Sequence, residues 1–446
     1  MRDTFNEPRI TVGIMDFQQE VQGILNGEYY IDGCFVSGRF AARVLSGAIV
    51  FSDEHGKEIT HASSIRLSDN DDTSTFMLFN VTIGGSFHWE RKETHVFRGT
   101  LVFKLRPDGT MAVINDIGLE DYLESVISSE MSAEAPEEFL KAHAIVSRSW
   151  LLSALKRKRD KKTTHQQNKT QQNKTDEIIR WYEQEEHDIY DVCADDHCQR
   201  YQGITRIISK GAFSAVSGTS GVVLVYQGEI CDARYYKACG GITEDFRTAW
   251  QDINIPYLKS ISDGANPYAP IETEQDARNW ILSEPDAYCN VKDQSLFKTI
   301  LPDFDRETKG FFRWSVEYPR ETLEGIITKK SGYDLGVLQE ITPLLRGPSG
   351  RIFRLLIKGS KKSMVVGKEL EIRRWLSESH LYSSAFVVDT TYNALGEVEK
   401  FTLYGAGWGH GVGLCQIGAA NMAYQGFTAE QILEHYFPYT EMQRIY

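Results

Sequence analysis

Long apolar runs are missing from this chain, and so is any excess of positive charge. No stretch of the 446 residues approaches the roughly 18 to 20 uninterrupted apolar residues of a membrane-spanning helix, so we expect no membrane span. The formal net charge of −13 argues against nonspecific binding to nucleic acid. Residues 1–17 also lack the basic and then apolar layout of a secretory signal peptide, so we expect no such leader in this chain.

The composition that remains is that of an ordinary globular protein. Hydrophobic residues make up 41% and charged residues 25% of the chain, which supplies enough apolar side chains for a large core. A chain of 446 residues is long for one domain, and we expect two or three domains.

The N-terminal region is rich in β-forming residues. Residues 8 to about 115 contain short apolar runs bounded by turn residues such as Asn26-Gly27 and Asp108-Gly109. The Asp-Gly pair between two such runs is a good hairpin signal. We interpret residues 1–93 as a β-rich accessory module, either separate from the catalytic region at residues 94–446 or part of its body.

Two helices with a short break between them are predicted within residues 119–155. The first has the spacing of an amphipathic helix, with apolar residues at Leu119, Leu123, Val126 and Ile127. The second should begin at Pro136, which suits a first helical position. Glu130 would then lie at a helix junction between two buried faces, where partial burial suits a general acid. The alternative for this residue is a solvated carboxylate at a helix end.

The remaining segments predict a mixed fold. Residues 156–176 are basic and then rich in Gln and Asn, with few apolar side chains, so a mobile surface loop is expected there. Helical spacing at residues 321–330 and 366–378, with a hairpin pattern between them, indicates a smaller lobe at about 270–395. The predicted fold class is therefore α+β: a β-rich N-terminal region and a mixed α/β body with a central cleft and an inserted lobe.

A cluster of potential metal ligands follows the predicted loop. Two imidazoles and two thiols fall within twelve residues, at His187, Cys193, His197 and Cys198. Zinc takes four nitrogen or sulfur ligands at structural sites, and such a closed site would hold the loop in place rather than catalyse. We predict structural zinc here; a Cys193–Cys198 disulfide and free side chains are the alternatives.

Glycine-rich motifs carry the other candidate residues. Tyr236 and Gly240-Gly241 lie in one of them, where small residues let backbone amides approach a ligand. In the other, residues 404–419, glycines flank Trp408 and His410 on both sides, and the indole ring can stack on a ligand.

Together these motifs resemble the SpoIID/LytB family, which comprises stage II sporulation protein D and the amidase enhancer LytB. The resemblance runs from about residue 95 to residue 446. It is carried by Glu130-Met131, by PEEFLKAHAIVSRS at 136–149, by residues 217–244 and by GWGHGVGLCQIGA at 407–419. The departures are mild, since His143 stands where the family usually has Gln, and Ser149-Trp150 where Thr-Tyr is common.

The resemblance implies a peptidoglycan lytic transglycosylase of the cell envelope. Glu130 would protonate the oxygen between MurNAc and GlcNAc, and its carboxylate would then remove a proton from the MurNAc 6-hydroxyl, which closes a 1,6-anhydro ring. One carboxylate suffices because the internal hydroxyl replaces water. The expected substrate-binding residues are Arg148, Tyr236, Gly240, Gly241, Trp408, His410 and Gln416. The family also includes members with a Cys/His zinc site in the segment of His187.

Other roles are compatible with the same residues. A noncatalytic enhancer that binds glycan strands and stimulates a cell-wall amidase fits the same family. A cysteine hydrolase would use Cys239 or Cys415 with His410. Arg148 could equally form a structural ion pair. The partners expected are peptidoglycan strands and, for the enhancer, a cell-wall amidase.

Overall fold

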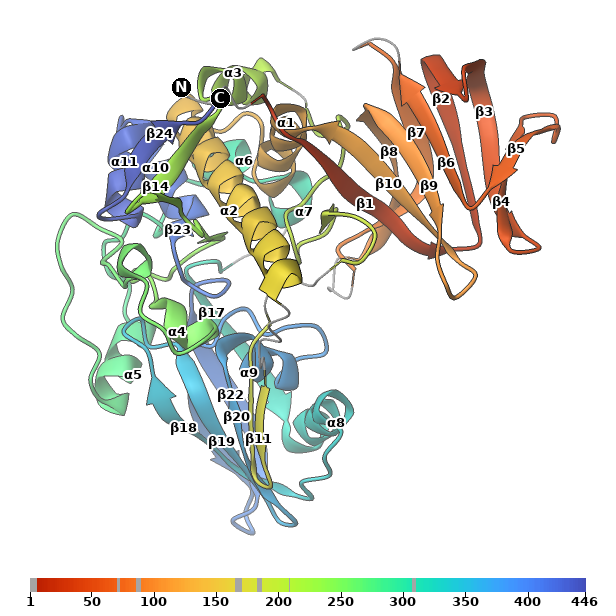
Figure 1. The fold of residues 1–446 in the computed structure, drawn as a ribbon. Coiled ribbons are helices and arrows are strands. Elements are labelled where there is room, and N and C mark those ends of the chain that lie inside the picture. The colour runs from red at the N-terminus through yellow and green to blue at the C-terminus, as the bar shows by residue number, and fades with distance from the viewer. Residues whose placement is uncertain are drawn as a thin grey trace. The chain divides into compact units, whose positions relative to one another are not determined.

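The computed structural model describes residues 6–69, 73–85, 90–164, 171–182, 187–207, 209–306 and 310–446. The fold is α+β, as predicted from the sequence (Figure 1). No helix among these residues is long and apolar enough to span a bilayer. The chain divides into two compact units: the first comprises residues 1–134, 184–222 and 443–446, and the second comprises 135–183 and 223–442.

The described part of the first unit is built on an 11-stranded sheet, whose N-terminal strands are red to orange in Figure 1. Its strands are β1 (Arg9–Gln18), β2 (Glu20–Ile31), β3 (Cys34–Leu45), β4 (Ala48–Asp53), β5 (Glu58–Ala62), β6 (Ser64–Asp69), β7 (Thr75–Ile83), β8 (Arg91–Arg98), β9 (Thr100–Leu105), β10 (Met111–Gly118) and β13 (Val192–Cys193). The order along the sheet is β13-β1-β10-β9-β6-β2-β3-β4-β5, and β7 pairs with β2 and β8.

The predicted turns have different outcomes. The hairpin at Asp108-Gly109 is confirmed, because β9 and β10 pair antiparallel across it and the Asp108 carboxylate accepts hydrogen bonds from the backbone and hydroxyl of Thr110. The turn at Asn26-Gly27 is wrong. These residues lie inside β2, where the register against β3 shifts between Leu25 and Tyr29, so the glycine serves a β-bulge.

The boundary predicted between residues 93 and 94 falls inside β8. The sheet continues across it, since β7 pairs with β8 and β6 pairs with β9. The division into an accessory module and a catalytic region stays a prediction.

Helices α1 (Leu119–Glu130) and α3 (Lys210–Gly218) complete the first unit and pack against each other. Strand β10 leads directly into α1, whose first turn carries Glu120 and Asp121 at the positive end of the helix dipole. The four apolar residues that predicted this helix are all fully buried. Its end at Glu130 confirms the predicted boundary.

Helix α2 (Glu137–Thr164) of the second unit begins one residue after its predicted start at Pro136. It extends beyond the predicted end, so the loop assigned to residues 156–176 is corrected. Residues 156–164 are helical because Lys and Arg are good helix formers, and Gln171–Lys174 form β11. Residues 165–170 of the predicted loop lie outside the described residues.

The other elements are, in chain order, β12 (Glu177–Arg180), β14 (Val222–Tyr226), β15 (Glu229–Ile230), β16 (Tyr235–Tyr236), α4 (Phe246–Ala249), the 3-10 helix η1 (Pro256–Leu258), α5 (Glu274–Leu282), α6 (Gln294–Ile300), α7 (Asp303–Arg306), β17 (Arg313–Pro319), α8 (Arg320–Ser331), β18 (Leu338–Arg346), β19 (Ile352–Gly359), β20 (Ser363–Gly367), α9 (Glu369–Trp375), β21 (Phe386–Tyr392), β22 (Val398–Ala406), β23 (Leu414–Cys415), α10 (Gln416–Tyr424), α11 (Ala429–Tyr436) and β24 (Glu441–Arg444).

Two sheets in the second unit share one apolar core. The sheets have the orders β11-β12-β20-β19-β18 and β17-β22-β21, and the core includes Leu323 of α8, Trp375 of α9 and Phe401 of β22. The predicted helices α8 and α9 and the β19–β20 hairpin are confirmed. The limits of the smaller lobe at about 270–395 stay a prediction.

Helices α10 and α11 both pack against α2. Thr428 and Gln431 form a capping box at the start of α11.

Candidate functional site

Glu130 is the last residue of α1, and only 8% of it is exposed. Met131 leaves the helical conformation (φ −132°, ψ 174°) and so ends the helix at this carboxylate. The backbone N–H of Arg200 donates a hydrogen bond of 3.0 Å to Glu130 Oε1. The carboxylate is therefore buried and oriented by a second segment of the first unit.

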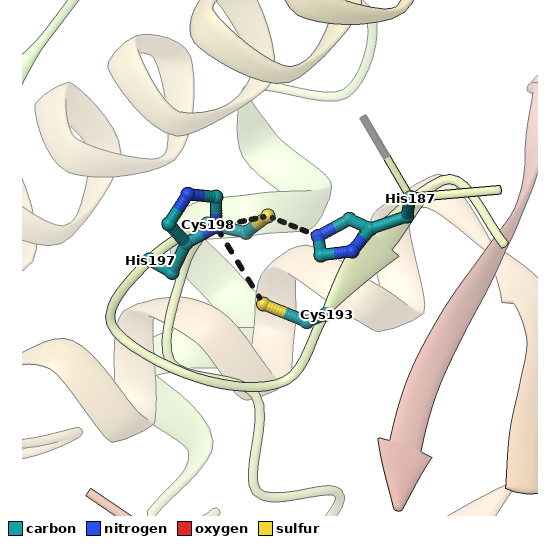
Figure 2. A group of neighbouring side chains, drawn as sticks. All are labelled: His187, Cys193, His197 and Cys198. Atoms are coloured by element: carbon teal, nitrogen blue, oxygen red, sulfur yellow. Dashed lines mark hydrogen bonds between the residues drawn. The ribbon is translucent and has the colours of Figure 1, made fainter. Parts of the chain in front are cut away.

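The four predicted metal ligands come together in that segment. His187, Cys193, His197 and Cys198 offer ligand atoms that all lie within 4.8 Å of one another (Figure 2). His187 Nε2 is 3.3 Å from Cys198 Sγ. His197 Nδ1 is 3.6 Å from the same sulfur and 4.0 Å from Cys193 Sγ. Neither of these two cysteines is in a disulfide, and the four ligand atoms lie close enough together to hold a metal ion.

The electrostatics of this group favour a thiolate. Hydrogen bonds to Cys198, and then to His187 and His197, lower the pKa of the Cys193 thiol. The thiolate is the form of cysteine that binds a metal.

Residues just after Cys198 contact α1 twice. The Tyr122 hydroxyl donates a hydrogen bond of 3.1 Å to Gln199 Oε1, and both side chains are fully buried. The next residue, Arg200, supplies the N–H that binds Glu130. Neither contact was predicted, because nothing in the sequence around Gln199 or Arg200 indicates a partner on α1.

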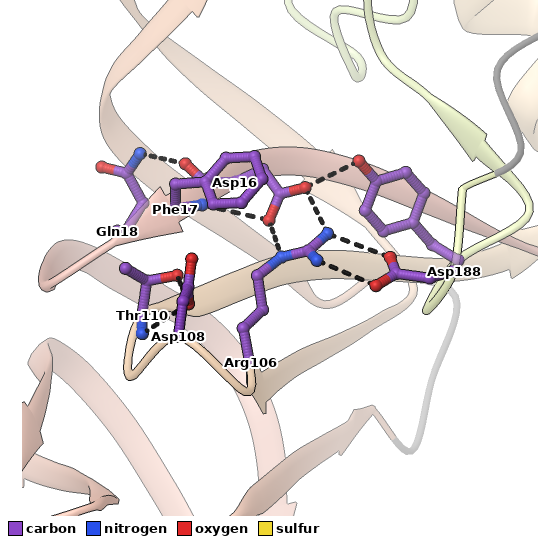
Figure 3. A network of polar contacts seen from close by, with 8 residues as sticks. Asp16, Phe17, Gln18, Arg106, Asp108, Thr110 and Asp188 are labelled. Carbon is purple, nitrogen blue, oxygen red and sulfur yellow. Dashed lines mark hydrogen bonds and ion pairs between the residues drawn. The ribbon is translucent and has the colours of Figure 1, made fainter.

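The segment with the four potential metal ligands runs from His187 to Arg200. Its His187 end is held by an ion-pair network (Figure 3). The guanidinium of Arg106 donates two hydrogen bonds to the Asp16 carboxylate, at 2.5 and 2.6 Å. It also binds the carboxylate of Asp188, the residue after His187, at 3.0 and 3.2 Å. The Tyr190 hydroxyl also donates a hydrogen bond to the Asp16 carboxylate, at 2.9 Å. Such paired N–H···O contacts fix orientation, so the network limits the movement of His187.

A partly buried aspartate, Asp195, anchors the middle of the same segment. One oxygen of Asp195 accepts a hydrogen bond of 2.9 Å from the backbone of Gly85. Burial, and then the neighbouring charge of Asp196, raise the pKa of Asp195 to about 6. Strand β13 pairs with β1 two residues earlier, so the segment is attached to the sheet.

In the second unit, the two glycine-rich motifs pair with each other. Strand β16 with Tyr236 lies parallel to β23, and the backbones of Ala238 and Trp408 exchange hydrogen bonds of 3.1 and 2.7 Å. Gly240 has φ +81°, and a Cβ there would lie 2.7 Å from the backbone nitrogen of Gly407. The small residues thus allow close packing of one motif against the other.

Aromatic rings surround the two side chains that the second motif presents. Trp408 is half-buried and stacks on Tyr382, with ring centroids 4.3 Å apart. The ring of His410 contacts Tyr236 at 5.2 Å and Trp250 at 4.9 Å. Its Nδ1 accepts a hydrogen bond from the Val412 backbone. Burial, and then the positive charges of Arg234 and Arg351, lower the pKa of His410 well below 6.5, so this imidazole is neutral.

The remaining predicted residues are buried. Arg148 on α2 has an exposed fraction of 0%, Gln416 of 2%, and Gly240 and Gly241 are also buried. The amide nitrogen of Gln416 lies 3.3 Å from His143 Nε2 on α2. Sequence reasoning did not identify Arg351, a fully buried side chain that donates hydrogen bonds to the backbone carbonyls of Gly409 and Cys239.

The thiols proposed for a cysteine hydrolase are buried as well. Cys239 is 2% exposed and Cys415 is 0% exposed. Their neighbours include each other, Cys289 and Asp263. A nucleophile must reach its substrate, and this burial gives the hydrolase no support.

The burial of His143 predicts an acid-sensitive step in stability. Burial, and then the charge of Lys237, lower the pKa of His143 to about 3, whereas an unfolded histidine titrates near 6.5. Below about pH 6.5 the unfolded chain binds a proton that the folded chain excludes, so stability falls toward pH 3. The free energy of unfolding should therefore fall between about pH 7 and pH 4.5. His143→Gln should reduce this fall by on the order of 2 kcal/mol, measured by urea unfolding at each pH.

A matched control is His55→Gln, since the side chain of His55 is 82% exposed. This variant should keep the pH dependence of the unmodified chain. If His143→Gln kept it too, the buried imidazole would not be its source.

The close packing of the second motif makes a further prediction at Gly413. This residue has φ +86°, and a Cβ would lie 2.1 Å from the carbonyl oxygen of Arg234. Gly413→Ala should destabilise the fold by roughly 3 kcal/mol, because the clash with backbone adds to the left-handed strain. Gly396 has φ +77° and nothing within 4 Å of its Cβ position. Gly396→Ala should therefore cost only the strain, about 1 kcal/mol. Equal losses in denaturant unfolding would contradict the close approach.

Comparison with known proteins gives two matched regions. Residues 107–226 match the stage II sporulation protein family (SpoIID), and residues 244–413 match a domain of unknown function, DUF8618. The amidase enhancer of Bacillus subtilis (strain 168) is 26% identical over 234 residues, which are 51% of this chain and 32% of that protein. Stage II sporulation protein D of Bacillus amyloliquefaciens is 23% identical over 331 residues, 73% of this chain and 74% of that protein. The matched region thus spans about a third of the amidase enhancer and about three quarters of the sporulation protein.

Proposed function

Because the chain belongs to the SpoIID/LytB family, we propose that it is a peptidoglycan lytic transglycosylase with Glu130 as general acid and base. Family membership carries the broader statement, a function related to the cell wall and the cell envelope. Cleavage of the glycan strand is the more specific step that we propose.

The observation that supports this step is the setting of Glu130. The carboxyl group is buried at the end of α1 and hydrogen-bonded by the backbone N–H of Arg200. A general acid must be held in a productive orientation before the substrate arrives. The backbone contact supplies that orientation and would persist through a change of protonation state, because the carboxylic acid also accepts hydrogen bonds.

The proposed reaction needs one carboxyl group. The Glu130 acid gives its proton to the oxygen between MurNAc C1 and GlcNAc, and the glycosidic bond breaks. The Glu130 carboxylate then takes the proton of the MurNAc 6-hydroxyl while that oxygen bonds to C1. The proton count returns to its starting value, and no water is consumed. Glycosidases that hydrolyse the bond need a second carboxyl group for a water or for a covalent intermediate.

We also propose that His187, Cys193, His197 and Cys198 bind a structural zinc ion. Two ligands of a tetrahedral zinc ion lie roughly 3.6 Å apart at the usual Zn–S and Zn–N bond lengths. The three measured separations, 3.3, 3.6 and 4.0 Å, lie around that value. With four protein ligands the zinc would hold the segment, and the segment places the Arg200 N–H at Glu130.

The glycan-binding roles follow the exposure of each side chain. Trp408 and His410 are half-buried, so we assign direct contact with a sugar to them, with the indole ring as the stacking surface. Arg148, Tyr236 and Gln416 are buried, and we assign to them, with Gly240-Gly241, the positioning of the surrounding backbone.

A second candidate is a glycan-binding enhancer of a cell-wall amidase. The name of the Bacillus subtilis relative, amidase enhancer, favours it, and the similarity covers 51% of this chain. In this case the chain would bind glycan strands and a cell-wall amidase without cleaving the strands itself.

The two candidates differ in what the chain releases alone. Purified peptidoglycan, with and without its stem peptides, should release soluble muropeptides when the full chain is added as the only enzyme. If neither substrate gave soluble product, while the chain bound the sacculi and accelerated an added amidase, the enhancer would replace the transglycosylase.

A further inference from the structure

Three cysteines and an aspartate form a second group of potential metal ligands among the described residues. The group consists of Cys239, Asp263, Cys289 and Cys415 of the second unit, and their ligand atoms all lie within 4.8 Å of one another. Each residue is at most 2% exposed. The four residues come from four separate segments of the chain, so only the folded second unit brings them together.

The sulfur atoms of the group lie close together, and two of them accept backbone hydrogen bonds. Cys239 Sγ lies 3.3 Å from Cys289 Sγ. The backbone N–H of Gly241 donates to Cys239 Sγ at 3.2 Å, and the N–H of Cys239 donates to Cys415 Sγ at 3.3 Å. Hydrogen bonds to the ligand atoms are a regular feature of protein metal sites, where they orient the ligands.

The carboxylate of Asp263 is oriented in the same way. Its Oδ2 accepts a hydrogen bond of 2.9 Å from the Cys289 backbone, and its Oδ1 accepts one of 2.5 Å from the Tyr436 hydroxyl. Cys289 is thus linked to Asp263 by its backbone and to Cys239 by its sulfur. The four groups form one connected arrangement.

We propose that Cys239, Cys289, Cys415 and Asp263 bind a thiophilic divalent cation, with zinc as its most suitable occupant. Three thiolates and a carboxylate buried together would repel one another, and a divalent cation at their centre offsets that repulsion. Soft sulfur ligands select zinc over magnesium or calcium, and a carboxylate is also a regular zinc ligand. As the cation binds, each thiol loses its proton to solvent, so the site changes protonation but not oxidation state.

The sulfur spacing fits such an ion after a small adjustment. Two thiolates on a tetrahedral zinc ion lie roughly 3.8 Å apart, and the Cys239 and Cys289 sulfur atoms lie 3.3 Å apart. An outward shift of about half an ångström, within the reach of a side-chain rotation, gives the tetrahedral spacing.

The site would hold the two glycine-rich motifs together. Cys239 directly precedes Gly240-Gly241, and Cys415 lies in the motif that carries Trp408 and His410. Strands β16 and β23 already pair beside it. A cation bound to both cysteines would therefore fix the backbone of both motifs, independently of the His187 group in the first unit.

Metal analysis of the purified full chain tests this proposal. The unmodified chain should hold two equivalents of zinc. Cys193→Ser/Cys198→Ser and Cys239→Ser/Cys289→Ser should each hold one, and the variant with all four substitutions should hold none. Cys231→Ser is the matched control, because Cys231 is 1% exposed in the same unit and belongs to neither group. It should keep two equivalents.

A spectroscopic measurement avoids dependence on the folding of the Cys239→Ser/Cys289→Ser variant. The Cys193→Ser/Cys198→Ser variant is loaded with Co²⁺, whose thiolate charge-transfer absorption grows with the number of bound sulfur atoms. The cobalt in this variant would be bound by three thiolates. Its band should be stronger than that of the Asp263→Asn/Cys289→Ser variant, in which only the His187 group, with two thiolates, is intact. A Cys193→Ser/Cys198→Ser chain that is folded but binds neither zinc nor cobalt would overturn the proposal. So would a mass lower by two hydrogens under non-reducing conditions, which would mark a disulfide at this site.

If the zinc site at His187 were absent instead, the unmodified chain and Cys193→Ser/Cys198→Ser would both hold one equivalent. Failure of the proposed zinc at His187 is therefore distinguishable from failure of this site.

Discussion

Glu130→Gln is expected to lower the rate of glycan cleavage by at least about 10²-fold, because removal of a general acid and base typically costs 10²- to 10⁴-fold. The amide has nearly the same volume as the carboxyl group, and its oxygen can still accept the hydrogen bond that Arg200 N–H donates to Glu130. The fold should therefore be kept while the proton transfer is lost. The measurement is the initial rate of muropeptide release from purified peptidoglycan.

Glu124→Gln is the matched control for this variant. Glu124 lies on the same helix, is 6% exposed, and accepts a hydrogen bond of 3.2 Å from Arg98. Glu124→Gln should lose only the partly exposed ion pair with Arg98. Its rate of glycan cleavage should therefore stay close to that of the unmodified chain. An unchanged rate in Glu130→Gln would remove Glu130 from the mechanism, and equal losses in both variants would point to damage of α1.

Cys193→Ser/Cys198→Ser is expected to have the second large effect, on stability as well as on activity. Loss of a structural zinc ion removes several kcal/mol of folding free energy, and at least about 3 kcal/mol is expected here. Cleavage should also fall, because the segment that contributes the Arg200 N–H to Glu130 is no longer held. Metal content and denaturant unfolding of the variant are the measurements, with a cleavage assay on the folded fraction.

Cys34→Ser provides the control, since Cys34 is an exposed cysteine of the same unit. It should keep the metal content, stability and cleavage rate of the unmodified chain. A Cys193→Ser/Cys198→Ser chain with full metal content would place the ion elsewhere. Full stability after verified metal loss would contradict the structural role.

Local signals in the sequence identified the elements that are formed by neighbouring residues. The apolar spacing on α1 and Pro136 before α2 both act within one or two helical turns. The four potential metal ligands of the His187 group could also be recognised, because they fall close together in the chain. Each of these signals depends on short-range geometry, which the residue order specifies directly.

Partners that are distant in the chain could not be identified in this way. The Arg200 contact to Glu130 joins residues 70 positions apart, and Cys239 and Cys415 are 176 apart. A single buried cysteine has the sequence context of a small apolar residue, so the second cysteine group becomes visible only in the folded chain. Strand pairing also overrides the local turn preference of Asn26-Gly27. These residues pair within the sheet and form a β-bulge in β2 opposite β3.

The mass of the product released by the unmodified chain tests the central claim most directly. Ring closure by the MurNAc 6-hydroxyl consumes no water, so each new glycan end should be lighter by one water molecule than the reducing end that hydrolysis leaves. Mass spectrometry of muropeptides released from purified peptidoglycan should therefore show 1,6-anhydro-MurNAc ends that are absent with Glu130→Gln. Ends of the hydrolytic mass, or no new glycan ends at all, would contradict the proposed reaction.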